Sequence, residues 1–385
     1  MRAVIDARPA LDPRRTGVGL YAQQIIRHLP HADPDHEYIA WYLHAKGLFR
    51  PRRFFEGIKA DNLSEKASRF PARVFGPLSN RVGVPRIEWS VDFDILLATN
   101  FLPPATHRDG VVLVVHDLAH EKLTDTAPHM NARWRRAFDR WLAKAAGVIV
   151  PSEATRADVL AGHDVDPERI HVTPLGVDVA AFSPSADAAV DAVRRKHGIT
   201  GPYALFVGGI EPRKNLENLV QAFASLAPGP RLVIAGGPVR WDPKAAERLD
   251  EVIATLAPAA RARIVRTGYV GDQEKVALLT GATLLAYPSL YEGFGFPVLE
   301  GFAAGVPVLT SATSSLPEVA GEAAVLVDPR DIEAIAEGLS QLFDDEDLRA
   351  MLSAAGLIRA SKFTWERTAR LTAAALHAAH EQSPG

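Results

Sequence analysis

The stretch YEGFGFPVLEGFAAGVP, residues 291–307, decides the fold class. It begins with a glycine-rich loop, has Pro297 where proline suits the first turn of a helix, and has Gly305 where that helix would stop. A short apolar run at 284–286 precedes the stretch, and another at 306–309 overlaps its end. Strand, glycine loop, helix and strand in this order predict one unit of a parallel sheet.

The same alternation runs along the rest of the chain. Further apolar runs of strand type lie at 111–115, 147–150, 204–207 and 232–235. A chain of 385 residues exceeds the size of one hydrophobic core, so we expect two domains. The proline- and glycine-containing segment 174–202 marks their junction. The predicted fold is α/β, with two doubly wound Rossmann-like domains, 1–178 and 179–362, that face each other across a cleft.

The composition is that of a globular protein. Hydrophobic residues make up 47% and charged residues 23% of the chain, the formal net charge is −3, and cysteine is absent. The lack of cysteine excludes disulfides and thiolate metal sites and favours a cytoplasm. No apolar run approaches the ~18 residues of a membrane span, and the charged start of the chain does not fit a secretory signal. We expect a cytoplasmic protein that binds no nucleic acid.

One segment departs from this balance. Between residues 50 and 86, nine lysines and arginines stand against three acidic residues. Such a segment is typical of a solvated surface, and the alternative is a patch for anionic lipid headgroups or for a phosphate-bearing acceptor. The second interpretation adds a peripheral location at the inner face of the membrane.

Two carboxylates in the quoted stretch are candidate ligand-binding groups. Glu292 lies in the glycine loop, and Glu300 lies about one turn into the predicted helix. Carboxylates repel phosphate but accept hydrogen bonds from sugar or ribose hydroxyls. Gly293 and Gly295 let the loop bring backbone N–H groups close to a ligand at the helix N-terminus. The stretch therefore predicts a site for a ligand rich in hydroxyls.

A second candidate site follows the predicted strand 204–207. The sequence GGIEPRKN places Arg213 and Lys214 directly before a helix, after a turn that contains Gly209. Arginine offers a planar fork of donors and lysine a compact charge, so the pair favours a diphosphate at a helix N-terminus. Asn215 is the expected helix cap. A solvated surface pair is the alternative.

Two features belong to the first domain. Gly17 and Gly19 start the first predicted helix, but the third glycine of a dinucleotide fingerprint is missing, so we favour an anion-facing turn over an NAD site. His116 follows the strand 111–115, and side chains at the carboxyl ends of parallel strands commonly line a site. A packed turn residue is the alternative for His116.

Together these residues resemble the family-4 retaining glycosyltransferases of the GT-B fold, and mannosyltransferase-like members in particular, over essentially the whole chain. Glu292 and Glu300 resemble the E-x7-E motif of that family, and Arg213 with Lys214 resembles its diphosphate-binding pair. The final stretch, 363–385, resembles the helix that crosses back onto the first domain.

The resemblance implies a role for each candidate residue. Arg213 and Lys214 would stabilise the leaving diphosphate, and Glu300 would accept hydrogen bonds from the nucleotide ribose. Val270 belongs to the segment that would read the base. The implied catalytic residues are His116, Arg213, Lys214 and Glu292, and the implied donor-binding residues are Gly17, Gly19, Gly209, Val270, Gly293, Phe294, Gly295, Phe296 and Glu300.

The implied reaction is the transfer of a hexose with retention, by a front-face mechanism without a metal or other cofactor. GDP-mannose is the favoured donor, with UDP-glucose or UDP-N-acetylhexosamine as the alternative. The acceptor would be a glycan or a lipid-linked sugar in polysaccharide biosynthesis. Two other classes stay open: an NAD-dependent enzyme that modifies nucleotide sugars, and a non-catalytic sugar-binding protein on the same fold.

Overall fold

The chain forms two compact units. The structure, a computed structural model, describes residues 1–12, 16–43, 54–55, 57–68, 86–123, 130, 132–239 and 241–382. Unit 1 comprises Met1–Leu118, Met130–Gly176 and Trp365–Gly385. Unit 2 comprises Ala119–His129 and Val177–Thr364. The C-terminal stretch thus belongs to unit 1, whereas a short segment after the first strands belongs to unit 2.

Unit 1 is a seven-stranded sheet in which all strands are parallel, in the order β3-β2-β1-β4-β5-β6-β7. Its strands are β1 (Arg2–Asp6), β2 (Glu37–Leu43), β3 (Leu63–Ser68), β4 (Ile95–Ala98), β5 (Val111–Val114), β6 (Gly147–Val150) and β7 (Ile170–Val172). Among its described residues, the helices of more than one turn are α1 (Gly17–Ala32), α4 (Ala132–Lys144), α5 (Glu153–Gly162) and α15 (Trp365–Gln382).

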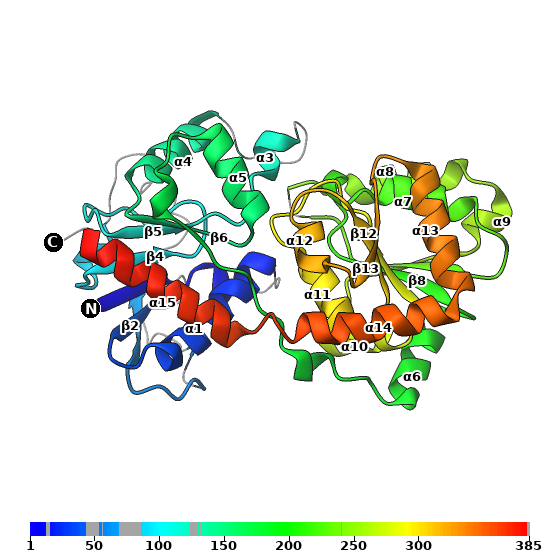
Figure 1. The fold of residues 1–385 in the computed structure, drawn as a ribbon, viewed down its shortest axis with the longest axis horizontal. Coiled ribbons are helices and arrows are strands. Elements are labelled where there is room, and N and C mark those ends of the chain that lie inside the picture. Colours follow the sequence, from blue (N-terminus) through cyan, green and yellow to red (C-terminus); the bar gives the residue numbers. More distant parts are fainter. Residues whose placement is uncertain are drawn as a thin grey trace. The chain divides into compact units, whose positions relative to one another are not determined.

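The central strands of unit 1 are apolar because both faces of the sheet are covered. Every residue of β4, β5 and β6 is buried. Helices α4 and α5 lie on one face, and α1 and α15 lie side by side on the other (Figure 1). Near-continuous apolar runs are what parallel strands under two helical layers require. The predicted alternation of strands and helices is therefore confirmed for this unit.

Unit 2 repeats the plan with a six-stranded parallel sheet in the order β10-β9-β8-β11-β12-β13. Its strands are β8 (Tyr203–Val207), β9 (Arg231–Ala235), β10 (Ile264–Gly268), β11 (Leu284–Tyr287), β12 (Val308–Ser311) and β13 (Ala324–Val327). Its helices include α3 (Ala119–Lys122), α6 (Asp187–His197), α7 (Leu216–Ala224), α8 (Ala245–Thr255), α9 (Pro258–Arg261), α10 (Asp272–Thr280), α11 (Phe296–Ala303), α12 (Leu316–Ala320), α13 (Ile332–Asp344) and α14 (Glu346–Ala360).

Two segments, 174–202 and 50–86, were predicted to connect the domains and to form a basic surface. The predicted junction 174–202 is not a continuous linker, because α6 occupies its middle and buries Val190. Gly198 ends that helix in the left-handed conformation that glycine adopts easily. The basic segment 50–86 lies mostly outside the described residues. Among the described residues, no helix is both long and apolar enough to span a lipid bilayer.

A buried carboxylate joins distant parts of unit 1. Asp33 ends α1 and accepts hydrogen bonds from the hydroxyl of Tyr38 and from ring nitrogens of His36 and His377, the last two at 2.9 Å. His377 lies on α15, so the contact ties the C-terminal helix to the end of α1. Burial alone would raise the pKa of this carboxyl, but the three hydrogen bonds outweigh it and lower the pKa below its ordinary value.

We expect Asp33→Asn to lower the free energy of unfolding by about 2 kcal/mol, because an amide replaces the charged acceptor. The pKa of the Asp33 carboxyl is lower in the folded protein than its unfolded-state value of about 4. The ionised carboxylate therefore stabilises the folded protein at pH values above about 4, and this stabilisation is lost as the pH falls through the folded-state pKa. The loss in free energy of unfolding of Asp33→Asn, relative to the wild type, should therefore be largest at neutral pH and become smaller in acid. Chemical denaturation across pH measures it, with Asp35→Asn at an exposed neighbour as the control. Equal stability of the two variants would contradict this role.

Candidate functional site

The strand order of unit 2 indicates the edge of the sheet at which a ligand binds. The chain leaves β8 toward β9 on one side, and it later returns to place β11 on the other side of β8. In open parallel sheets, ligands bind outside the carboxyl ends of the strands at such a reversal. The segment that follows β8 contains Arg213 and Lys214, and the segment that follows β11 contains Glu292. The backbone N–H of Leu290 donates to the carbonyl of Arg213 at 2.8 Å, which holds the two segments together.

Glycines allow the turns after β8 and β9 to pack backbone against backbone. Gly236 has φ +155°, and a Cβ there would lie 1.8 Å from the carbonyl oxygen of Gly208. A Cβ on Gly209 would lie 2.7 Å from Val239. Any side chain at these positions would force the two turns apart. Gly209 therefore has a packing role in this structure, and so does Gly236 in the second glycine pair, 236–237.

The segment after Gly209 is a single 3-10 turn, Pro212–Lys214, followed by α7. Asn215 joins them with φ 59°, a left-handed conformation that asparagine tolerates better than most residues. Its side chain does not cap α7, contrary to the prediction. Instead its amide donates to the carbonyls of Pro288 and Pro329, at 3.0 and 2.6 Å. Asn215 thus fixes the cation-bearing turn against the loop after β11.

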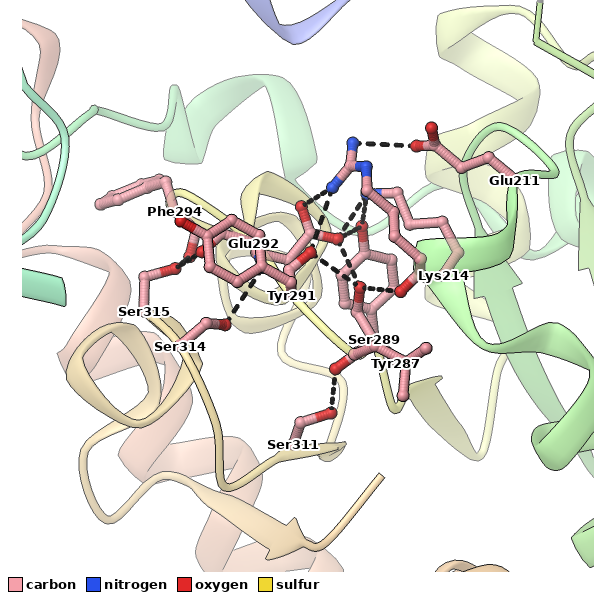
Figure 2. Close-up of polar contacts among 12 residues, drawn as sticks. Glu211, Lys214, Tyr287, Ser289, Tyr291, Glu292, Phe294, Ser311, Ser314 and Ser315 are labelled. Carbon is pink, nitrogen blue, oxygen red and sulfur yellow. Dashed lines mark hydrogen bonds and ion pairs between the residues drawn. The ribbon is translucent and has the colours of Figure 1, made fainter. Parts of the chain in front are cut away.

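The half-buried Arg213 and the buried Lys214 both pair with Glu292, and Figure 2 shows Lys214 and Glu292 side by side. The guanidinium of Arg213 contacts Glu292 Oε2 at 2.6 Å with Nη1 and Glu211 at 2.8 Å with Nη2. The ammonium of Lys214 donates to Glu292 Oε1 at 2.5 Å and to the hydroxyl of Tyr287. The predicted cations and the predicted loop carboxylate are therefore direct partners, although 78 residues separate Lys214 from Glu292.

The environment keeps Glu292 ionised. Its side chain is only 8% exposed, and burial alone would raise its pKa. The charges of Arg213 and Lys214, with hydrogen bonds to the carboxylate, outweigh burial and lower the pKa of Glu292 to about 2. The hydroxyls of Tyr287 and Ser289 also donate to its Oε1, both at 2.8 Å.

The pKa values of two partners of Glu292, Lys214 and Tyr287, are also shifted. Burial, followed by the charge of Arg213, lowers the pKa of the Lys214 ammonium. Burial and the charge of Glu292 raise the pKa of the Tyr287 hydroxyl well above its ordinary value. Two cations and two carboxylates, Glu211 and Glu292, thus form a compact ion cluster. Its geometry holds both cations at the carboxyl ends of β8 and β11, where an anionic ligand is expected.

The loop before α11 presents backbone to the same region. Gly295 has φ +111°, and a Cβ there would lie 2.7 Å from Leu316, so glycine is required both for conformation and for space. The hydroxyl of Ser314 accepts from the N–H of Glu292 at 3.1 Å. Ser315 donates to the carbonyls of Glu292 and Phe294 (Figure 2). Helix α11 then begins at Phe296 with proline in its first turn, as predicted.

Glu300 lies on α11 and makes a separate ion pair. Its Oε1 contacts the ammonium of Lys275 on α10 at 2.6 Å, and Lys275 also lies over the ring of Phe182, 5.2 Å from its centroid. Glu300 is buried. Val270 follows β10, the outermost strand, directly after Tyr269, a residue that is 72% exposed.

The predicted residues of unit 1 have local roles. Thr16 caps α1 by accepting from the N–H of Gly19 at 3.1 Å, and a Cβ on Gly19 would lie 2.9 Å from the carbonyl oxygen of Pro9. A ring nitrogen of His116 bonds to the carbonyl of Thr99 at 2.9 Å, and burial lowers the pKa of the imidazole. Glycine at position 19 therefore permits a close approach between α1 and the preceding turn.

Four residues of the cluster and its surroundings escaped the sequence analysis. Glu211 stands in the quoted motif GGIEPRKN, but its pairing with Arg213 depends on the turn geometry. Tyr287 is the last residue of a strand, a position where side chains often face a ligand. The other two, Ser289 and Lys275, carry no motif signal.

Comparisons with known proteins agree with this architecture. The family described as Glycosyltransferase Family 4 matches residues 15–181, and the family described as Glycosyl transferases group 1 matches residues 190–358. The two matches follow one another along most of the chain. The chain belongs to these glycosyltransferases. It is an enzyme of two parallel-sheet, Rossmann-like domains of the GT-B type that uses a nucleotide sugar.

Individual relatives of this glycosyltransferase are distant. It is 29% identical to the O-antigen chain mannosyltransferase B of Escherichia coli over 387 residues, which cover 95% of this chain and 97% of the relative. It is 28% identical to a D-inositol 3-phosphate glycosyltransferase of Corynebacterium efficiens, with 82% and 76% covered. HepE from Anabaena, solved with UDP-glucose, has a TM-score of 0.73 at 18% identity, with 98% and 99% covered.

Proposed function

We propose that this glycosyltransferase transfers mannose from GDP-mannose, with retention, to a glycan or a lipid-linked sugar acceptor. The ion cluster of Arg213, Lys214, Glu211 and Glu292 carries the proposal, because it aligns the half-buried Arg213 and the buried Lys214 at the carboxyl ends of adjacent strands. The similarity to a mannosyltransferase over nearly the full length favours mannose. UDP-glucose or a UDP-N-acetylhexosamine is the alternative donor, since HepE was solved with UDP-glucose.

In this proposal, residues 179–362 bind the donor. Arg213 and Lys214 lie against the diphosphate, while Glu292 and Glu211 keep the cations in place before the donor arrives. The N–H groups from Gly293 to Phe296, at the start of α11, bind the sugar. The carboxylate of Glu300 accepts hydrogen bonds from the ribose hydroxyls. Its ion pair with Lys275 either breaks when the donor binds or leaves one carboxylate oxygen for the ribose. Val270 and its neighbours read the base.

The cluster supports a reaction without an enzyme nucleophile. The bond from the sugar C1 to the diphosphate breaks as the acceptor oxygen attacks C1 from the same face. The leaving phosphate oxygen takes the proton of the acceptor hydroxyl, so the configuration at C1 is retained. Arg213 and Lys214 stabilise the negative charge that grows on the diphosphate, which is electrostatic preorganisation. Glu292, held ionised inside the cluster, is a positioning group for the two cations.

Residues 1–178, together with the final helix 363–385, form the acceptor side in this proposal. His116 contacts the transferred sugar, and the glycine turn of Gly17 and Gly19 at the start of α1 approaches the diphosphate of the donor. The basic segment 50–86 is the proposed peripheral contact with an anionic membrane.

A donor panel tests the assignment. Ligands that bind the native state raise its stability by RT ln(1+[L]/Kd). We expect GDP-mannose and GDP to raise the melting temperature more than UDP-glucose, UDP-N-acetylglucosamine, UDP or ADP-glucose. Proton NMR of the product formed from GDP-mannose should show the same anomeric configuration as the donor. A larger increase in melting temperature with the UDP ligands would show that the donor is a UDP-sugar and not GDP-mannose. A product with the inverted anomeric configuration would rule out the front-face mechanism.

A chelator tests the role of the cations. If Arg213 and Lys214 supply the positive charge that a divalent ion supplies elsewhere, transfer should continue at an unchanged rate after dialysis against EDTA. The measurement is release of the nucleoside diphosphate with and without added Mg²⁺ or Mn²⁺. Loss of transfer in EDTA, with recovery on adding either ion, would show that the cluster does not suffice.

A further inference from the structure

A second cluster of ionisable side chains lies in unit 1, and the proposed reaction does not use it. Asp33 follows α1, His36 directly precedes β2, and His377 belongs to α15. Nδ1 of His36 lies 2.9 Å from one carboxylate oxygen of Asp33, and Nε2 of His377 lies 2.9 Å from the other. One such atom from each of the three side chains lies within 4.8 Å of the other two. Two imidazoles and one carboxylate therefore converge in a small volume.

The carboxylate of this cluster has no permanently charged partner within the described part of the chain. Its ion pairs there are both with histidine, and neither lysine nor arginine pairs with it. The side chain of Asp33 is 11% exposed, whereas those of His36 and His377 are 27% and 39% exposed. A largely buried anion is stabilised by a close cation. The two half-exposed imidazoles give a dissolved cation a route to it.

Outer hydrogen bonds hold the cluster in place. The hydroxyl of Tyr38 donates to the same carboxylate oxygen of Asp33 that faces His377. The side-chain amide of Asn62 donates to three backbone carbonyls between residues 30 and 36, at 3.0, 3.2 and 2.8 Å. The segment that carries Asp33 and His36 is thus fixed from outside. Outer partners of this kind orient the ligands of a metal ion before it binds.

The chemistry of the three side chains selects a transition-metal ion. Neutral imidazole suits Zn²⁺, Ni²⁺ and Cu²⁺, whereas Mg²⁺ and Ca²⁺ prefer sites made of oxygen. Ligand atoms at about 2.0–2.2 Å from a tetrahedral Zn²⁺ lie about 3.4 Å apart. The nitrogen and oxygen atoms that now lie 2.9 Å apart would have to separate by only about 0.5 Å. Water takes the remaining position of a site with three protein ligands.

We propose that Asp33, His36 and His377 bind one divalent transition-metal ion, Zn²⁺ in the first place, and that this ion fastens α15 to the end of α1. In the ion-free protein, the ring nitrogens that face the carboxylate carry a proton, because an ionised carboxylate only accepts hydrogen bonds. When the ion binds, each of these nitrogens releases its proton and offers a lone pair. The other nitrogen of each ring takes up a proton, so both imidazoles remain neutral.

The position of the site gives the ion a structural role. Helices α1 and α15 lie side by side (Figure 1), and the two ligands Asp33 and His377 are 344 residues apart in the chain. An ion bound to both holds the C-terminal helix on unit 1 and makes its local opening rarer. The ion takes no part in the transfer reaction, so this proposal does not rest on the proposed function.

Metal binding to the full chain, first freed of ions with EDTA and then dialysed, tests the site. For a Kd of about 1 µM, Zn²⁺ at about 0.1 mM should raise the melting temperature by about 5 °C, and Mg²⁺ at the same concentration should not. Titration calorimetry should show one Zn²⁺ bound per chain with this affinity. The variant His36→Gln/His377→Gln should lose the increase and bind Zn²⁺ at least about 100-fold more weakly. Tyr38→Phe keeps all three ligands and should weaken binding about 10-fold.

The matched control is His107→Gln, which removes an exposed histidine of unit 1 and should keep the full increase in melting temperature. Each variant is compared with its own metal-free melt, so a loss of stability caused by the substitution itself cancels. In hydrogen exchange, Zn²⁺ should slow the amides of α15 in the wild type and in His107→Gln, but not in the double variant. No increase with Zn²⁺, an equal increase with Mg²⁺, or an increase that the double variant retains would overturn the proposal.

The transfer reaction keeps this test apart from the proposed function. Below both melting temperatures, the Zn²⁺-loaded and the chelated protein should release nucleoside diphosphate at the same rate. A rate that falls on chelation and is restored by Zn²⁺ in the wild type but not in the double variant would contradict the purely structural role of the ion. Failure of Zn²⁺ to bind would leave the donor site of unit 2 untouched.

Discussion

Lys214→Met is expected to reduce transfer at saturating donor by about 100- to 1000-fold. This is the loss seen when one group aligned with a growing negative charge is removed. The donor should also bind more weakly, because the diphosphate loses the buried one of its two cations. The fold should persist, since Arg213, Tyr287 and Ser289 still contact Glu292. Breaking a buried pair costs about 3 kcal/mol, within the 5–15 kcal/mol by which domains are stable.

Initial rates of nucleoside diphosphate release measure this effect, with a thermal melt to follow the fold. Lys196→Met is the matched control, because Lys196 is an exposed lysine of unit 2 that pairs with Glu274. It should change neither quantity appreciably. Lys214→Arg retains the charge and should recover part of the rate. If Lys214→Met turned over like the wild type with unchanged donor affinity, the cluster would not be the donor site.

Glu292→Gln is expected to lower the free energy of unfolding by about 3–5 kcal/mol at neutral pH and to abolish most transfer. The change leaves the half-buried Arg213 and the buried Lys214 with Glu211 as their remaining carboxylate, and a buried charge that loses its partner is costly. Adding Lys214→Met to this variant should cost less than the sum of the single effects, because the two side chains share one interaction. Strict additivity would contradict the coupling.

The same variant gives a pH signature. The folded-state pKa of Glu292 is about 2, below the unfolded-state value of about 4.3. The stabilisation is therefore full above about pH 5 and is lost as the pH falls toward 2. The difference between wild type and Glu292→Gln should be constant from pH 7 to pH 5 and then shrink. Glu322→Gln, at an exposed carboxylate, should show no such trend.

Much of the architecture followed from local sequence. The apolar runs predict strands covered on both faces, and Pro297 and Gly305 predict the limits of α11, because each requirement involves only a few neighbouring residues. The cation pair and the two glutamates were identifiable for the same reason. Each stands at a fixed distance from a strand end, and in a parallel sheet the strand ends are where ligands bind.

The sequence was a poor guide where a short polar segment depends on its surroundings. The stretch around Val190 reads as a linker between prolines and glycines, but it forms α6 once a neighbouring surface covers its single buried face. The sequence predicts Asn215 as a helix cap, yet its side-chain amide donates hydrogen bonds to the carbonyls of Pro288 and Pro329, far along the chain. Local capping preference is worth about 1 kcal/mol, so tertiary hydrogen bonds readily replace it.

By itself the sequence determined the fold class, the enzyme family and the residues that carry charge near the strand ends, because these depend on spacing along the chain. Only the tertiary structure decided which of those charges meet. Lys214 and Glu292 become partners because β11 pairs with β8 across the reversal of strand order. Asp33 reaches His377, 344 residues away, because α15 packs beside α1. Pairing of strands and helices distant in sequence is a property of the assembled core, which no local spacing records.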